Sequence, residues 1–267
     1  MIIKINEIIK KDMIPDEIPS DNINGPVVFK RPIFYPNGPK WIMYFAHHNG
    51  NGIRVAESDD LTKNWTVKNY TIIDINKIPG NGHIASPEVI IKENKLELFY
   101  HCCYRGLQCT FKSITHNGID WEYEKEIQGL FYFRVINEEY AIAKYNNDGG
   151  IWYKKENDKF IEKGRLLPRM RHCCYHNNKL YWSEIGDMPE VIYRGDLNIC
   201  DFTIKNKEII IVPSEDYEIT SKLAPSTLGP AVGVTEVRDP YVIKENEKTY
   251  IYYTVRGEEG IAIAEIL

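Results

Sequence analysis

The strongest constraint on the fold is a phrase that recurs along the chain. In three places an Xaa-Pro pair opens a short apolar run, a polar turn follows, and an aromatic-rich run closes the phrase. The three copies read KRPIFYPNGPKWIMYF, ASPEVIIKENKLELFY and RDPYVIKENEKTYIYY. Each copy then continues through a Gly-containing loop into a further strand-like run, which reads GIRVAES, LQCTFKS or GIAIAEI. Self-similarity of this kind is typical of propellers and other repeat architectures.

Two weaker copies, YFRVINEEYAIAKYNNDGGIWYKKE and RHCCYHNNKLYWSEIGDMPEVIYRGD, lie between the second copy and the last. The resulting five units start near residues 31, 86, 134, 171 and 239, roughly 50 residues apart, as propeller blades do. Four short antiparallel strands per unit, without a convincing helix, predict an all-β chain folded as a five-bladed β-propeller. We expect residues 1–267 to form a single domain. A twisted β-sandwich with irregular repeats is the alternative.

The last unit reaches the end of the sequence after its third strand, so its outer strand must come from elsewhere. The Ile-rich segment at residues 2–9 is the obvious donor. We therefore predict that an N-terminal strand closes the last blade and covers an otherwise open sheet edge.

Composition and termini restrict the setting. The net charge of −5 gives no reason to expect nucleic acid or an anionic membrane as partner. The N-terminal stretch MIIKINEIIKKDMIP lacks the apolar core of a signal peptide, and no later run reaches a membrane-spanning length. The vicinal pairs Cys102–Cys103 and Cys173–Cys174 do not resemble a disulfide ladder. These features predict a cytoplasmic protein and leave its oligomeric state open.

In a propeller, the heads of the inner strands and the loops between second and third strands meet at one mouth of the central channel. This rule selects a set of basic side chains for substrate binding, namely Arg31, Arg134, Arg171, Arg238, His48 and His83, to which Glu88 is added because it shares a strand face with Ser86. Arginine donates two parallel hydrogen bonds to carboxylate, sulfate or phosphate. The set predicts a carbohydrate ligand that carries an acidic or phosphorylated group. The alternative is that these arginines pair with Asp239, Glu190, Glu236 and Glu88 and join the blades.

Acid–base candidates come from the same mouth. Asp239 is the best single carboxylate, because the adjacent Arg238 favours its ionised form. Glu190 or His172 is the expected acid from the opposite side, since glycosidic hydrolysis uses a pair of groups across the bond. For Glu190 and Glu88 a salt bridge between blades is an equally good interpretation.

The histidines allow a metal site as an alternative. His48, His83, His101 and His172 belong to different strands and loops, and could surround a divalent ion in the channel, but no fixed spacing supports it. No cofactor is expected to be required, and a divalent metal remains the alternative.

The repeated phrases resemble those of five-bladed glycosidases, the clan of family 43 arabinanases and xylosidases and family 32/68 fructan enzymes. SPEV resembles a second-blade phrase of family 43, and VRDPYV resembles the Arg-Asp-Pro motif of the fructan enzymes. A closer resemblance, to bacterial glycosidase-like proteins, is carried by NGPVV, FAHHNGNGIRVA, HIASPE, YFRV, MRHCC, MPEVIY and EVRDPYVI. The resemblance spans nearly the whole chain and implies a propeller that acts on carbohydrate.

The chain also departs from the clan. Family 43 has an acidic residue at the head of blades one, three and four. The corresponding places in this chain hold Arg31, a position near Arg134 and the segment 170–172. The Arg-Asp-Pro motif stands in the last blade instead of a middle one. The clan's mechanism therefore does not transfer directly.

Three functions remain open at this stage. The first is a glycoside hydrolase-like enzyme acting on a small glycan or glycoside, with Asp239 as base or transition-state stabiliser. The second is a lyase that eliminates across a uronic acid with a His or Tyr base. The third is a sugar-binding propeller without catalysis. The irregular segment 209–234 is expected either to cover the funnel mouth or to form an interface arm.

Overall fold

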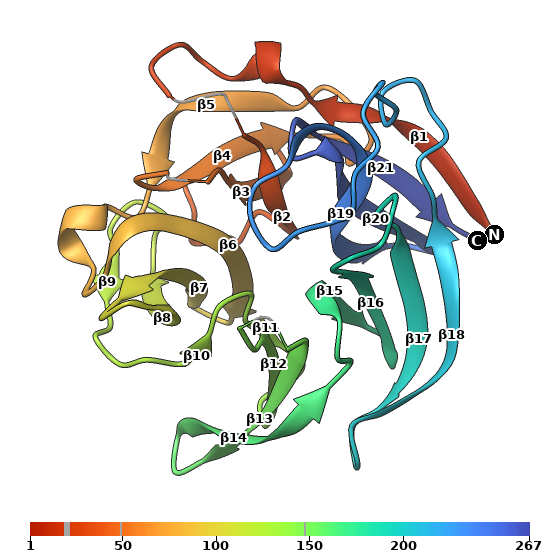
Figure 1. The fold of residues 1–267 in the computed structure, drawn as a ribbon. Helices are drawn as coiled ribbons and strands as arrows, with labels where there is room; N and C mark the ends of the chain where they lie inside the picture. The colour runs from red at the N-terminus through yellow and green to blue at the C-terminus, as the bar shows by residue number, and fades with distance from the viewer. Residues whose placement is uncertain (19–21, 49, 147) are drawn as a thin grey trace.

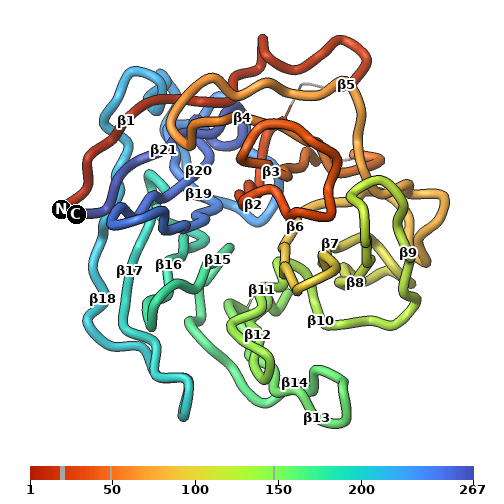
Figure 2. Tube along the Cα trace, turned by 180° about the vertical axis from the view of Figure 1, so that it is seen from behind, coloured from red at the N-terminus to blue at the C-terminus, as the bar shows by residue number. Residues whose placement is uncertain are grey.

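The computed structural model describes residues 1–18, 22–48, 50–146 and 148–267. Five antiparallel sheets are arranged in a ring around a central channel (Figures 1 and 2). The prediction of an all-β, five-bladed β-propeller is therefore confirmed. No helix within the described ranges is long and apolar enough to cross a membrane.

The first three blades follow the chain from their inner to their outer strands. Blade one contains β2 (Asn24–Lys30), β3 (Trp41–Ala46), β4 (Ile53–Ser58) and β5 (Thr66–Ile72). Blade two contains β6 (Asn81–Lys92), β7 (Lys95–Tyr104), β8 (Leu107–Thr115) and two short outer strands, β9 (Glu122–Tyr123) and β10 (Gly129–Leu130). Blade three contains β11 (Arg134–Val135), β12 (Tyr140–Lys144), β13 (Gly150–Glu156) and β14 (Lys159–Leu166).

Blades four and five complete the ring. Blade four contains β15 (Met170–His176), β16 (Lys179–Glu184), β17 (Ile192–Asn198) and β18 (Thr203–Ile211). Blade five contains β19 (Val232–Glu245), β20 (Lys248–Gly257), β21 (Gly260–Ile266) and β1 (Ile2–Ile9). Two 3-10 turns, η1 (Lys11–Met13) and η2 (Ile75–Lys77), lie in the connections.

The N-terminal strand closes the ring as predicted. β1 pairs antiparallel with β21, from Ile2 opposite Ile266 to Ile9 opposite Ile261. Ile8 and Ile9 are buried, and Glu7 accepts an ion-pair contact from Arg256 at 2.7 Å. The outer edge of the last blade is thereby covered by the other end of the same chain (Figure 1).

The core lies between adjacent blades and is rich in strand aromatics. Trp65 of blade one meets Tyr252 of blade five edge-to-face, with ring centroids 6.4 Å apart. The Tyr252 hydroxyl donates to the Leu61 carbonyl at 2.9 Å, so the polar end of this buried ring is also satisfied. Large rings shared between blades stabilise the ring by burying apolar area on both sides of each seam.

The predicted start of blade one is wrong. β2 begins at Asn24 and ends at Lys30, so Arg31 follows the inner strand instead of heading it. Val27 pairs with Tyr44, as Glu88 pairs with Phe99 and Tyr241 with Tyr252. The counterpart of the Ser-Pro and Asp-Pro pairs in blades two and five is therefore the Gly-Pro of NGPVV, and RPIFYPNGPK is the connection between β2 and β3.

Candidate functional site

The heads of four inner strands share an unusual backbone conformation. Gly25, Ser86, Tyr132 and Asp239 have φ values of 57°, 51°, 55° and 53°. Gly25, Ser86 and Asp239 lie at irregularities of the strand pairing, two residues before regular pairing resumes, and Tyr132 lies two residues before the first pair of its hairpin. A left-handed conformation costs free energy in a residue with a side chain and recurs at functional sites. Here it turns the Ser86, Tyr132 and Asp239 side chains toward one cavity at the mouth of the channel.

This cavity has a volume of about 320 Å³ and includes residues from every blade except the fourth, together with a loop. Its lining consists of Asn24, His48, His83, Ala85, Ser86, His101, Gln108, Phe131, Tyr132, Leu228, Gly229, Pro230, Asp239 and Glu258. Two carboxylates and three imidazoles therefore face the same space, beside two aromatic rings. We refer to it as the funnel cavity.

Glu258 is the most heavily bonded group in the funnel cavity. It lies on the loop between β20 and β21, is completely buried, and its Oε1 accepts from Arg171 at 2.7 Å and from Arg238 at 3.1 Å. Its Oε2 accepts from the amides of Asn22 at 2.5 Å and Asn24 at 3.2 Å, and lies 2.9 Å from Nδ1 of His48. Burial alone would raise its pKa, but the hydrogen bond from His48 and the two guanidinium charges outweigh burial and hold the pKa well below the usual range.

Asp239 has the opposite electrostatic character. Its Oδ1 accepts from Arg171 at 2.7 Å, and its Oδ2 accepts from the Gly25 N–H at 3.2 Å. Burial raises the pKa of the Asp239 carboxyl above its ordinary value, although Arg171 lowers it in part. The nearby negative charge of Glu258 raises it further. Two carboxyl groups in one cavity thus have pKa values displaced in opposite directions.

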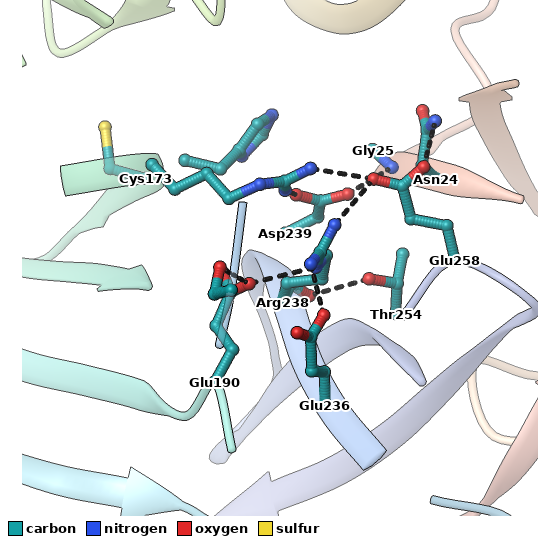
Figure 3. A network of polar contacts seen from close by, with 12 residues as sticks. Asn24, Gly25, Cys173, Glu190, Glu236, Arg238, Asp239, Thr254 and Glu258 are labelled. Carbon is teal, nitrogen blue, oxygen red and sulfur yellow. Dashed lines mark hydrogen bonds and ion pairs between the residues drawn. The ribbon is translucent and has the colours of Figure 1, made fainter. Parts of the chain in front are cut away.

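One guanidinium joins this pair. Arg171 donates through one terminal nitrogen to Asp239 and through the other to Glu258 (Figure 3 labels the two acids). Because the two nitrogens belong to one rigid group, the bonded oxygens are at most about 8 Å apart. The separation of the paired carboxyl groups in retaining glycosidases, about 5–5.5 Å, falls within this limit.

The arginines at the mouth do not form an open anion site. Arg134, Arg171 and Arg238 are 2%, 1% and 0% exposed, and none of them belongs to the lining of the funnel cavity. Arg238 is enclosed by Glu190, Glu236 and Glu258 (Figure 3). These guanidinium groups are therefore not free for a ligand, contrary to the expectation from the sequence. The structure supports the alternative in which the arginines join the blades.

Arg134 joins three blades from inside the channel. Its guanidinium donates to the Pro87 carbonyl at 2.6 Å, to Glu88 at 3.2 Å and to the Cys173 carbonyl at 3.1 Å. Burial raises the pKa of Glu88 to about 7, despite the opposing charge of Arg134. Glu88 lies outside the lining of the funnel cavity, so its contact with Arg134 is the inter-blade salt bridge.

Two other candidates lie behind the cavity wall. Glu190 is completely buried, accepts from the Ser226 hydroxyl and lies 3.0 Å from Nε of Arg238. His172 is 1% exposed, and its Nε2 lies 3.0 Å from Arg134. Burial, reinforced by the charge of Arg134, holds the His172 pKa well below its usual range. Neither side chain reaches the funnel cavity, so the expected acid from the fourth blade is not present there.

Arg31 lies elsewhere because blade one begins earlier than predicted. Its guanidinium contacts Glu57 at 2.6 Å and donates to the Pro39 and Pro36 carbonyls at 2.7 and 2.9 Å. These contacts hold the β2–β3 connection at the end of the strand opposite Asn24. The structure therefore separates Arg31 from Asp239 and the other mouth residues.

His48 and His83 do lie in the funnel cavity, and His101 joins them. Nε2 of His83 and Nε2 of His101 are 3.2 Å apart, and the rings of His48 and His83 are 6.4 Å apart. Burial lowers the pKa of His83 and holds that of His101 well below its usual range, so both imidazoles are neutral at neutral pH. In the described part of the chain no group of three or more His, Cys, Asp or Glu side chains is placed to hold a metal.

The irregular segment before blade five crosses the funnel mouth. Leu228, Gly229 and Pro230 line the cavity, and the Thr227 carbonyl accepts from Arg171 at 3.3 Å. The Ala231 carbonyl accepts from the Glu258 N–H at 2.8 Å. The segment is thus fixed to the residues that hold the two acids, which supports the expectation that it covers the mouth.

The sequence-based candidates omitted Glu258, Asn24 and Asn22. The rule for loops at the mouth selects the RGEEG segment, and NGPVV is one of the phrases that carry the resemblance to glycosidase-like proteins. Neither observation identifies which of two adjacent glutamates points inward.

Comparisons with known proteins agree with this architecture. No protein-family model matches the sequence. Among curated proteins, an uncharacterized protein of Acanthamoeba polyphaga mimivirus is 25% identical over 297 residues, covering 92% of this chain and 83% of that protein.

Solved structures with the same fold include glycoside hydrolases. A glycosyl hydrolase from Bacteroides ovatus has a TM-score of 0.64 at 11% identity, covering 93% of this chain and 84% of its own. A family 43 β-xylosidase/α-arabinofuranosidase from a compost microbial metagenome has a TM-score of 0.63 at 12% identity, with coverages of 97% and 96%. The arabinanase of Bacillus subtilis has a TM-score of 0.56 at 12% identity, with coverages of 94% and 96%. The chain therefore has the five-bladed propeller fold of these glycoside hydrolases.

Proposed function

We propose that this protein is a glycoside hydrolase that cleaves an uncharged glycan or glycoside in the funnel cavity. The observation that carries the proposal is the pair Asp239 and Glu258, which share the cavity and have pKa values displaced in opposite directions. Two carboxyl groups separated in this way provide an acid and an ionised partner at the same pH.

The hydrogen bonds assign the two roles. Oδ1 of Asp239 faces the Arg171 guanidinium, so a proton on this carboxyl resides on Oδ2. From there it is transferred to the oxygen of the leaving group as the glycosidic bond breaks, water then adds to the anomeric carbon, and the proton that this water loses restores the Asp239 carboxyl group. Glu258 stays ionised, because five donors surround it, and its negative charge stabilises the oxocarbenium-like transition state. This assignment makes Asp239 the acid, whereas the sequence suggested a base or transition-state stabiliser.

The lining favours an uncharged sugar over an acidic one. No arginine or lysine belongs to the lining of the funnel cavity, while two carboxylates do. A uronate would be desolvated beside the ionised Glu258, and no cation of the lining would be free to pair with it. The His83 and His101 imidazoles, with the Asn24 and Gln108 amides, suit sugar hydroxyls. The Phe131 and Tyr132 rings suit the apolar face of a sugar.

Elimination and binding without catalysis are less consistent with the site. An elimination mechanism needs a base beside a cation that neutralises a uronate, and the lining supplies a second carboxylate in that place. A binding module has no requirement for two buried acids with opposite pKa displacement, which cost stability to maintain.

The proposal is tested by mass spectrometry after incubation with neutral and acidic oligosaccharides in water enriched in oxygen-18. We expect cleavage of a neutral member, with one labelled oxygen in the product that carries the new reducing end. Asp239→Asn should lower the cleavage by about 10²–10⁴-fold, while Asp196→Asn, at a site on β17 paired with Lys179, should retain it. Unsaturated, unlabelled products would show that the reaction is elimination and not hydrolysis. Binding of an oligosaccharide without any product would show that the protein binds sugar without cleaving it.

A further inference from the structure

A second hollow runs along the outside of the molecule, at the seam between blades one and two. One cavity of about 520 Å³ is bordered by the end of β5 and by the segment 118–123 of blade two. A neighbouring cavity of about 250 Å³ shares Tyr70, Ile72, Gly118 and Ile119 with it. The shared walls make the two cavities one elongated hollow, which we call the seam groove.

Aromatic rings and hydrogen-bonding groups alternate in the seam groove. Tyr70 is 50% exposed and Ile119 is 66% exposed, so both present apolar surface to the solvent. The Tyr123 hydroxyl accepts from the Asp74 N–H at 3.3 Å, which leaves its own proton for a ligand. Nε1 of Trp121 is buried in the wall of the groove and has no hydrogen-bond acceptor within the described residues. Flat rings beside hydroxyl and amide groups complement the apolar faces and the hydroxyls of sugars.

The charges in the lining of the seam groove balance, because the cations Arg31 and Lys68 are matched by the carboxylates Glu57 and Asp74. Arg31 and Lys68 both contact Glu57, at 2.6 and 2.8 Å. The Asp74 carboxylate accepts from the Asn76 N–H at 2.9 Å and caps η2. The groove therefore offers little net charge to a ligand, which favours a neutral chain over a polyanion or a basic peptide.

The seam groove and the funnel cavity receive residues from the same connection. Asn51 belongs to the groove and lies on the β3–β4 connection, which also supplies His48 to the cavity. The Gly50 carbonyl on this connection accepts from the Ile84 N–H at 2.8 Å, next to His83. Both views of the ribbon show β5 and β9 at the outer rim of neighbouring blades (Figures 1 and 2). A chain that leaves the cavity over this connection is directed toward the groove.

We propose that the seam groove is a secondary binding site for neutral glycan, holding distal units of a chain whose end lies in the funnel cavity. This inference rests on the proposed function only in one respect, namely that the same glycan chain occupies both the groove and the funnel cavity. Tyr70 forms the exposed platform on which a sugar ring stacks, and the loss of this platform weakens the binding of long chains without changing the reaction of short ones.

The test uses affinity electrophoresis through gels that contain soluble xylan, arabinan, mannan or β-glucan. The protein carries Asp239→Asn, so that the chain is not cut during the run. We expect at least one neutral polysaccharide to retard it, and Tyr70→Ala in the same background to weaken the binding by about tenfold, as the loss of a stacked ring implies. Tyr175→Ala, a half-buried tyrosine of blade four, is the matched control and should bind as the parent does.

A second measurement separates the groove from the cavity. With Asp239 intact, Tyr70→Ala should cleave a short aryl glycoside at the parental rate. Equal retardation of Tyr70→Ala and its parent, an absence of retardation by every polysaccharide, or Tyr70-dependent binding of peptides in place of glycan would each overturn the inference. If glycan binding depends on Tyr70 while Asp239→Asn leaves cleavage unchanged, the groove stands and the proposed mechanism fails.

Discussion

Asp239→Asn is expected to lower turnover of an unactivated glycoside by about 10²–10⁴-fold, the usual contribution of a general acid. The amide cannot supply a proton, although it keeps the size of the side chain and an acceptor for Arg171. The loss should shrink strongly for a dinitrophenyl glycoside, whose leaving group departs without protonation.

Glu258→Gln should behave differently. Its carboxylate acts on the sugar and not on the leaving group, so turnover should fall by a similar factor for good and poor leaving groups alike. Thermal melting of each variant separates catalysis from folding, and Asp196→Asn again serves as the control. An equal loss of turnover for both leaving groups in Asp239→Asn would show that Asp239 is not the general acid.

Arg238→Met is expected to destabilise the fold by about 3–5 kcal/mol, the cost of leaving buried charges without their partner. Arg238 is completely buried and lies 3.0 Å from Glu190 and 3.1 Å from Glu258, with Glu236 on its third side. Methionine occupies a similar volume without charge, so the loss reports the uncompensated carboxylates more than a cavity. Urea unfolding at neutral pH, followed by tryptophan fluorescence, measures it.

Two further variants make this result interpretable. Arg194→Met removes an outer-strand partner of Glu208 and should cost less than about 1 kcal/mol, as exposed pairs do. Adding Glu190→Gln to Arg238→Met removes one of the stranded charges and should restore part of the stability. A loss under about 1 kcal/mol in Arg238→Met would show that the arginine does not hold the blades together.

The fold was predictable because each repeat contains the sequence pattern of a complete β-hairpin. The aromatic strand and the Gly-containing loop recur with the Xaa-Pro pair, so the pattern survives the weak third and fourth copies. The start of blade one was misplaced because two Xaa-Pro pairs, Gly25-Pro26 and Arg31-Pro32, compete there. The second pair gives the spacing of the other blades. The longer β2–β3 connection of blade one makes the first pair the structural counterpart.

The candidate site was predictable only in part, because its chemistry depends on contacts between distant segments. Asp239, His48 and His83 follow from the geometry of any propeller mouth. The pairing of Arg171 with Glu258 joins residues 87 positions apart and reverses the meaning of the arginine, from ligand binding to fixing two acids. Residue type and spacing along the chain do not show which guanidinium groups are already neutralised.

The most direct test of the account is the titration of Asp239 and Glu258, followed by carbon-13 NMR of their side-chain carboxyl groups, with Asp239→Asn and Glu258→Gln to assign the signals. The account predicts that the Asp239 pKa lies above the ordinary value for aspartate and the Glu258 pKa lies well below that for glutamate. In Glu258→Gln the Asp239 pKa should fall, because a neighbouring negative charge is removed. An ionised Asp239 with a pKa below that of Glu258 would contradict the assignment of acid and stabiliser on which the proposed hydrolysis depends.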